Sequence, residues 1–187
     1  MQDYIGSSAK VIVSSTAMMF VLLSSSWIPL YYINGAVVNA ILSKVLKNVF
    51  RVPRPALANE GGYGMPSSHA QSLFYFVTIL SCLGSKNIPK DNRIYGYIGF
   101  AFTLTYAVTA STWRVVTHLH TYTQTIVGAI LGILMGFIVH NVEVTNNISN
   151  ALQQPVPWTL RLFIIIFGAF VLYYRDLKEF IGSKKNI

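Results

Sequence analysis

Long apolar stretches alternate with short polar segments along most of this chain. Six stretches have roughly the length of a membrane-crossing helix, which needs about 17–25 mostly apolar residues. They are Ala9–Ser25, Trp27–Leu46, His69–Gly84, Ile94–Thr112, Tyr122–His140 and Trp158–Tyr174. The segments between them are polar and rich in turn-forming residues. The pattern predicts an all-α fold, a six-span transmembrane helical bundle that forms a single domain over residues 1–187.

The fifth stretch carries glycines four residues apart, at positions 128, 132 and 136. Positions spaced by four lie on one face of a helix, and small residues there let a second helix approach closely in a membrane. The same step extended backwards reaches Gln124 and then His120. We therefore expect these two polar side chains to share the packed face and to point into the bundle.

Six spans would put three polar segments on the same side of a membrane, where they could build one active site: Lys47–Pro55, Pro66–His69 and Arg114–Gln124. In the first segment, Lys47 and Arg54 are two helical turns apart, so they point the same way while the helix lasts. Pro53 and Pro55 are expected to stop that helix. A basic anchor at a membrane end is the alternative interpretation of this segment.

The second segment, Pro66-Ser67-Ser68-His69, opens the third apolar stretch. Free backbone N–H groups at a helix start favour an anion. Ser67 and Ser68 add hydroxyl donors, and they are also suited to capping the helix. Capping alone does not account for His69 at this position.

The third segment holds Arg114, two histidines and a glutamine. Gln124 lies one helical turn beyond His120 and can accept a hydrogen bond from one ring nitrogen, which leaves the other nitrogen unprotonated. His118 and His120 are two apart, so they cannot face the same way on a helix. Acidic ligands are lacking nearby, and we therefore expect no metal site.

The amino-acid composition and net charge limit the classes of partner that are expected for this chain. Apolar residues make up 53% of the chain and charged residues 11%, which departs from soluble usage towards membrane proteins. The net charge is +8, but the cations are scattered between apolar stretches and form no basic stripe, which argues against nucleic acid. Anionic lipid headgroups or phosphorylated substrates are the expected partners. Cys82 is the single cysteine, so the chain can form no internal disulfide.

Together the three segments supply three cations (Lys47, Arg54 and Arg114), hydroxyl or amide donors and two histidines. Charge-assisted contacts of this kind stabilise the charge that develops on oxygen during phosphoryl transfer, and they need no metal cofactor. One histidine would attack phosphorus while the other protonates the departing oxygen.

The order and spacing of these residues resemble the type 2 phosphatidic acid phosphatase superfamily of membrane lipid phosphatases. The shared pattern is Lys-x6-Arg-Pro, then Pro-Ser-x-His, then Arg-x5-His-x3-(Asp/Gln). The resemblance implies that His120 is the nucleophile and forms a phosphohistidine, that His69 protonates the leaving group, and that Gln124 orients His120. It further implies a phosphate-binding set made of Lys47, Arg54, Arg114, Ser67 and the backbone at Ser68.

Two positions depart from the family pattern. Trp113 stands where the family usually has Ser, and Gln124 stands where it usually has Asp. A neutral amide orients imidazole but stabilises imidazolium less than a carboxylate would. Gln124, together with Gly-Met-Pro-Ser-Ser-His-Ala-Gln-Ser at residues 64–72, is similar to two branches. These are the plastid-type (epsilon) lipid phosphate phosphatases, which look closer, and the dolichyl diphosphatases.

We therefore expect a metal-independent hydrolase that removes phosphate from phosphatidic acid, giving diacylglycerol, or from related lipid phosphates. A dolichyl or polyprenyl diphosphatase with the same site is the first alternative, and a catalytically silent membrane lipid-binding protein is the second. We expect an integral multi-pass membrane protein of the plastid envelope or the endoplasmic reticulum. Ten of the 14 Lys and Arg residues fall on the site side, which favours its cytoplasmic or stromal placement. A glycosylation sequon at Asn147 falls on the other side.

Overall fold

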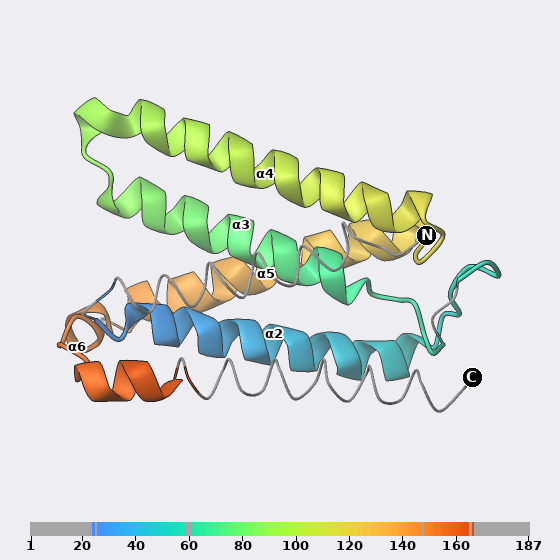
Figure 1. Cartoon of the computed structure of the whole chain (residues 1–187), viewed down its shortest axis with the longest axis horizontal. Helices are drawn as coiled ribbons and strands as arrows, with labels where there is room; N and C mark the ends of the chain where they lie inside the picture. The colour runs from blue at the N-terminus through green and yellow to red at the C-terminus, as the bar shows by residue number, and fades with distance from the viewer. Residues whose placement is uncertain (1–23, 25, 59–60, 147, 165, 167–187) are drawn as a thin grey trace.

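The computed structural model describes residues 24, 26–58, 61–146, 148–164 and 166. Within that part of the chain the fold is helical, and the expectation of an all-α fold is confirmed there. The elements are α2 (Ile28–Phe50), α3 (Ser68–Asn87), the short 3-10 turn η1 (Lys90–Asn92), α4 (Arg93–Val116), α5 (Tyr122–Thr145) and α6 (Ser149–Leu152). Residues 158–164 form a further helical segment (Figure 1).

Four of the six predicted spans correspond to the long helices α2 to α5, whose C-terminal ends lie a few residues beyond the predicted ones. The first predicted span lies outside the described residues except for Ser24, and the sixth is described only over its first part. Asn147 of the sequon is also outside the described residues. By length and composition, α5 is the one helix in the described part that is apolar enough to cross a membrane, with a mean hydropathy of 2.0. The six-span arrangement stays a prediction.

Helices α3 and α5 pack closely along the glycine ridge of α5. A Cβ atom on Gly128 would lie 2.5 Å from the Ser67 carbonyl oxygen, and one on Gly136 would lie 2.7 Å from Thr78 Cβ. A Cβ on Gly132 would collide with the carbonyl of Gln71. The predicted close approach along this ridge is confirmed. Because the contacts advance together along both helices, α3 and α5 run parallel.

Helix α2 runs antiparallel to α3, since its later residues contact the earlier residues of α3. Asn39 of α2 meets Gln71, and Ser43, one turn further on, meets Ser68. The short turn after α3 sends α4 back along it as well (Figure 1). The C-terminal ends of α2 and α4 and the N-terminal ends of α3 and α5 therefore gather at one end of the bundle. This is the arrangement that the three polar segments require.

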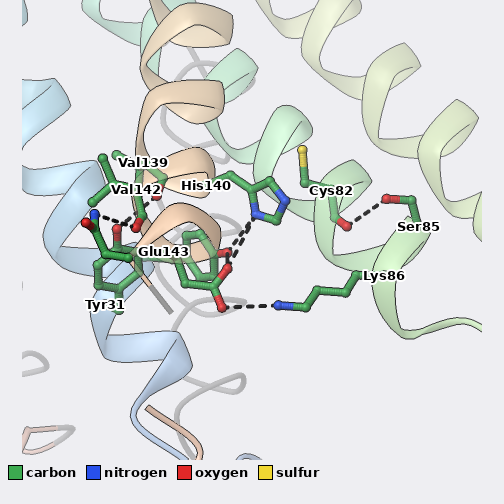
Figure 2. Close-up of polar contacts among 10 residues, drawn as sticks. Tyr31, Cys82, Ser85, Lys86, Val139, His140, Val142 and Glu143 are labelled. Carbon is green, nitrogen blue, oxygen red and sulfur yellow. Dashed lines mark hydrogen bonds and ion pairs between the residues drawn. The ribbon is translucent and has the colours of Figure 1, made fainter. Parts of the chain in front are cut away.

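A buried acid ties three helices together at the opposite end (Figure 2). Residue Glu143 on α5 is 1% exposed. It accepts hydrogen bonds from the Tyr32 hydroxyl of α2 at 3.2 Å and from Lys86 Nζ of α3 at 3.3 Å. His140 Nδ1 lies 3.0 Å from the same Tyr32 hydroxyl. These contacts fix the far end of the bundle, about 28 Å along α5 from its first turn.

Candidate functional site

His120 lies in the turn between α4 and α5, and its ring is only 3% exposed. Its backbone N–H donates to the Arg114 carbonyl at 3.1 Å, which ties the turn to the last helical turn of α4. Its Nδ1 is 3.2 Å from Gln124 Oε1. An amide oxygen can only accept, so Nδ1 carries the proton and donates it. The other ring nitrogen, Nε2, is left with a lone pair.

Contacts at both ends hold the Gln124 amide in this orientation. Its Oε1 also accepts from the Thr121 backbone N–H at 3.2 Å, while the Thr121 hydroxyl accepts from the Gln124 N–H, which together form a capping box at the start of α5. Its Nε2 donates to the Pro53 carbonyl at 2.8 Å. A Cβ on Gly64 would lie 2.6 Å from Oε1, so a glycine is what lets this loop lie against the amide. Gln124 thereby links the nucleophile candidate to the segment that carries Arg54.

Arg54 reaches His120 from the segment that follows α2. Its Nη1 donates to the Leu119 carbonyl at 3.1 Å and lies 3.4 Å from His120 Nε2. The prediction that the prolines of this segment end the helix is wrong, and Lys47 and Arg54 do not lie on one helix. Helix α2 ends at Phe50, before either proline, because Arg51 adopts a left-handed conformation with φ of 50° and its N–H donates to the Lys47 carbonyl. Arg54 therefore approaches from an irregular segment.

That segment is held by pairing with the loop before α3. Pro53 and Tyr63 form an isolated antiparallel bridge, and the Gly64 N–H donates to the Val52 carbonyl at 2.8 Å. The loop contacts fix Arg54 on one side and the entry to α3 on the other. The first polar segment is thus joined to the loop that leads into the second.

The environment of His120 keeps its imidazole neutral. Its pKa is lowered from 6.5 to about 4, chiefly because the ring is buried and next because the Arg54 guanidinium is close. The hydrogen bond to Gln124 raises this pKa, whereas the charges of Arg114 and Lys47 lower it further. All three predicted phosphate-binding cations therefore act on this ring. A neutral imidazole at physiological pH has the lone pair that a nucleophile needs.

The start of α3 contributes the remaining predicted residues. Ser67 is the N-cap, and its hydroxyl accepts from the Ala70 N–H at 3.5 Å, so the capping role considered for it is observed. Its own N–H donates to the Gln124 carbonyl at 2.9 Å. Ser68 Oγ lies 2.7 Å from Ser43 Oγ. His69 is the second residue of α3 and is half-buried at the same end of the bundle.

The structure brings His120, Gln124 and Arg54 into direct contact. The elements that carry the other predicted residues begin or end at the same end of the bundle. His118, in contrast, is exposed and has φ of 57°, so it does not share the buried side of the turn. The sequence interpretation missed Ser43 and Asn39 of α2. Their signal was present, because residues 39, 43 and 47 are spaced by four and form a polar line through an apolar helix.

Residues 28–148 match the PAP2 superfamily. The chain belongs to this superfamily. It is similar to lipid phosphate phosphatase epsilon 2, chloroplastic, of Arabidopsis thaliana, at 34% identity over 66% of this chain and 43% of the relative. It is also similar to dolichyldiphosphatase 1 of Dictyostelium discoideum, at 31% identity over 58% and 49%. The chain thus spans less than half the length of these relatives. The resemblance inferred from the three motifs is confirmed.

A solved structure shares the fold of this PAP2 superfamily chain. The crystal structure of the first transmembrane PAP2 type phosphatidylglycerolphosphate phosphatase from Bacillus subtilis aligns with a TM-score of 0.63. The alignment covers 78% of this chain and 79% of the other at 18% sequence identity. The helical arrangement described above is therefore that of a known membrane phosphatase fold.

Proposed function

We propose that this chain is a metal-independent lipid phosphate phosphatase that acts through a phosphohistidine on His120. One observation carries the proposal: a buried, neutral His120 donates from Nδ1 to Gln124 and presents the lone pair of Nε2 beside the Arg54 guanidinium. A phosphoryl group at this place would meet the nucleophile and a positive charge at once. That combination serves phosphoryl transfer, in which positioning and charge stabilisation do most of the work.

The proposed reaction has two steps. In the first, His120 Nε2 attacks phosphorus, the bond from phosphorus to the lipid oxygen breaks, and His69 gives its proton to that oxygen. In the second, water attacks phosphorus and gives a proton to His69, the bond from phosphorus to His120 Nε2 breaks, and inorganic phosphate leaves. Arg54, Arg114 and Lys47 balance the negative charge on the phosphoryl oxygens in both steps. Gln124 holds the ring so that Nε2 keeps facing phosphorus.

We propose that the substrate is phosphatidic acid or a related lipid phosphomonoester. The Arabidopsis relative, 34% identical over 66% of this chain, is named a lipid phosphate phosphatase. Dolichyl or polyprenyl diphosphate is the second candidate, favoured by the similarity to dolichyldiphosphatases of Dictyostelium discoideum and Saccharomyces cerevisiae. Both lipids offer a terminal phosphoryl group to the same residues. Activity of the purified protein confined to dolichyl diphosphate would decide for the second candidate.

We further propose that the bundle spans a membrane several times, in the plastid envelope or endoplasmic reticulum, with the site near one face. Helices α2, α4 and α5 are 23, 24 and 24 residues long, which suits a span. Their outer surfaces expose large apolar side chains, including Val45 at 52%, Phe102 at 75% and Ile130 at 51%. Such continuous apolar surfaces are rare on soluble proteins and fit contact with lipid.

The mechanism is tested with His120→Ala and His69→Ala in purified protein. With lipid phosphate radiolabelled on phosphorus and a rapid quench in alkaline detergent, because phosphohistidine is labile in acid, the parent should carry label on histidine, whereas the His120 variant should carry none. The His69 variant should lose least on a substrate whose leaving group hardly needs a proton. Full activity of His120→Ala would exclude the phosphohistidine mechanism. A parent protein that binds lipid phosphate without hydrolysing it would support the silent lipid-binding alternative.

A further inference from the structure

A buried polar contact joins α2 to α3 immediately below the site. Gln71 Nε2 donates to Asn39 Oδ1 at 2.8 Å and to the Asn39 carbonyl at 3.1 Å. Asn39 Nδ2 returns a longer hydrogen bond to the Gln71 carbonyl at 3.4 Å. Both side chains are almost completely buried. The pair fixes how far α2 can slide along α3, because any shift would leave buried amide groups without partners.

One helical turn closer to the site, the hydroxyls of Ser43 and Ser68 meet. Their oxygens are 2.7 Å apart, which is the usual length of a hydroxyl–hydroxyl hydrogen bond. Ser43 is 1% exposed, whereas Ser68 is half-buried in the first turn of α3. Only Ser68 can therefore be reached by a ligand, and Ser43 lies behind it.

The two hydroxyls have two protons, and one of them lies in the bond between the oxygens. An anion at the N-terminus of α3 can only accept hydrogen bonds, so the Ser68 hydroxyl donates to it. The bond between the serines is then made by Ser43, which donates to Ser68 Oγ. A donor chain of this kind strengthens the outer hydrogen bond, since each hydroxyl polarises the next.

We propose that Ser43 of α2 is a positioning residue for phosphate, acting through the Ser68 hydroxyl, a role that rests on the proposed function of the site. The sequence predicted the Ser68 hydroxyl as a donor, and the family resemblance implied the backbone at position 68. The contact with Ser43 adds a second hydroxyl behind the Ser68 side chain. Asn39 and Gln71 support this contact by holding α2 in register.

Loss of the Ser43 hydroxyl should weaken phosphate binding rather than stop the chemistry. A single neutral hydrogen bond corresponds to about a threefold to tenfold change in affinity. We expect Ser43→Ala to raise KM for phosphatidic acid, and the inhibition constant of inorganic phosphate, by about that factor. The kcat value should change less than about twofold, because the contact is made with bound substrate and transition state alike.

A double-mutant cycle of Ser43→Ala and Ser68→Ala tests whether Ser43 acts through Ser68. The two effects should not add: in the Ser68→Ala protein, removal of the Ser43 hydroxyl should leave KM unchanged. Ser111→Ala is the matched control, because Ser111 is a buried serine on α4 whose hydroxyl has no hydrogen-bond partner among the described residues. It should leave KM and the inhibition constant as in the parent. Ser43→Cys keeps the volume and provides the same test if the alanine variant folds poorly.

Additive effects of the two substitutions, or an unchanged inhibition constant in Ser43→Ala, would overturn the role of Ser43. The proposed phosphatase activity is judged separately, by hydrolysis in the parent and its loss in His120→Ala. If the parent hydrolyses no lipid phosphate, the same cycle is measured on inorganic phosphate binding by thermal shift. A coupling there would uphold Ser43 as a phosphate-positioning residue although the enzyme assignment had failed.

Discussion

Gly128→Ala should separate the two helices whose N-termini build the site. Gly128 lies on α5, against the backbone of Ser67. The added Cβ would be 2.5 Å from the Ser67 carbonyl oxygen, whereas ordinary contact begins near 3.4 Å. The separation is thus roughly 0.9 Å too short, and the opposing atom belongs to the backbone, which cannot rotate away as a side chain can. Helix α5 must therefore move from α3 at this point, or α3 must bend.

The displacement falls where it matters most for the proposed chemistry. Ser67 N–H donates to the Gln124 carbonyl at 2.9 Å, and Gln124 in turn holds His120. Moving α5 by most of 1 Å would stretch this link and shift His120 relative to the start of α3. Misplacement of that size can reduce a rate about 100-fold. Overpacking should also lower the free energy of unfolding by about 1–3 kcal/mol.

Two other glycines separate the effect on activity from the effect on stability. Gly136→Ala lies on the same ridge, about 12 Å further along α5, and would press on the Thr78 side chain. It should lower stability and keep kcat/KM per folded molecule near that of the parent. Gly99→Ala, whose Cβ would meet nothing within 4 Å, should change neither quantity appreciably.

The assay is phosphate release from phosphatidic acid in mixed micelles, with rates normalised to folded protein by thermal unfolding in the same detergent. A Gly128→Ala protein that keeps kcat/KM within about twofold of the parent would contradict a displacement of His120. An equal loss of activity in Gly136→Ala at equal folded concentration would contradict it too, because the loss would then reflect general loosening of the bundle.

Two further predictions concern buried ionisable groups. Because the pKa of His120 is lowered to about 4, the acid limb of kcat/KM that belongs to this ring should lie near pH 4, and a limb near 6.5 would contradict its neutral state. As pH falls, the unfolded chain takes up a proton on this histidine before the folded chain does. The contribution of the neutral ring to the free energy of unfolding is therefore complete above about pH 6.5. About 3 kcal/mol of it is lost as pH falls to about 4, which unfolding measured at each pH should show. Glu143→Ala should cost about 2 kcal/mol of stability, because Lys86 and Tyr32 lose their buried acceptor, although Lys86 can turn to solvent. Since the site is at the other end, kcat/KM per folded molecule should persist, and its selective loss would argue against separate roles for the two ends.

The sequence predicted the elements that local pattern can determine. Apolar stretches located α2 to α5, and the four-residue glycine step identified the face of α5 that meets α3. It also placed Gln124 on that face, although His120 itself lies in the turn before the helix. The end of α2 was misjudged because a left-handed Arg51 ends the helix earlier than the prolines do. A positive φ at arginine has no clear sequence signal.

Contacts between residues far apart in the chain could not be predicted from the sequence pattern. Glu143 and Lys86 are 57 positions apart, and neither carries a local sign that it will find the other. The position of Ser43 on the polar line with Lys47 indicated a packed role, but the sequence did not indicate which residue it contacts. The line gains meaning only when α3 is laid antiparallel against it, because then Ser68 stands opposite Ser43. Pairing of helical faces is a property of the packed bundle.

The geometry around Gln124 gives a physical reason for an amide at a position where the family pattern has a carboxylate or an amide. One end of the side chain must accept, from His120 Nδ1 and the Thr121 N–H, and the other must donate, to the Pro53 carbonyl at 2.8 Å. A carboxylate would satisfy the first end and place an oxygen against the carbonyl oxygen at the second. It would also raise the pKa of His120 by stabilising imidazolium, which opposes the effect of burial and Arg54. The amide therefore keeps His120 neutral and at the same time fastens the Arg54 segment to it, two tasks that one carboxylate could not perform in this packing.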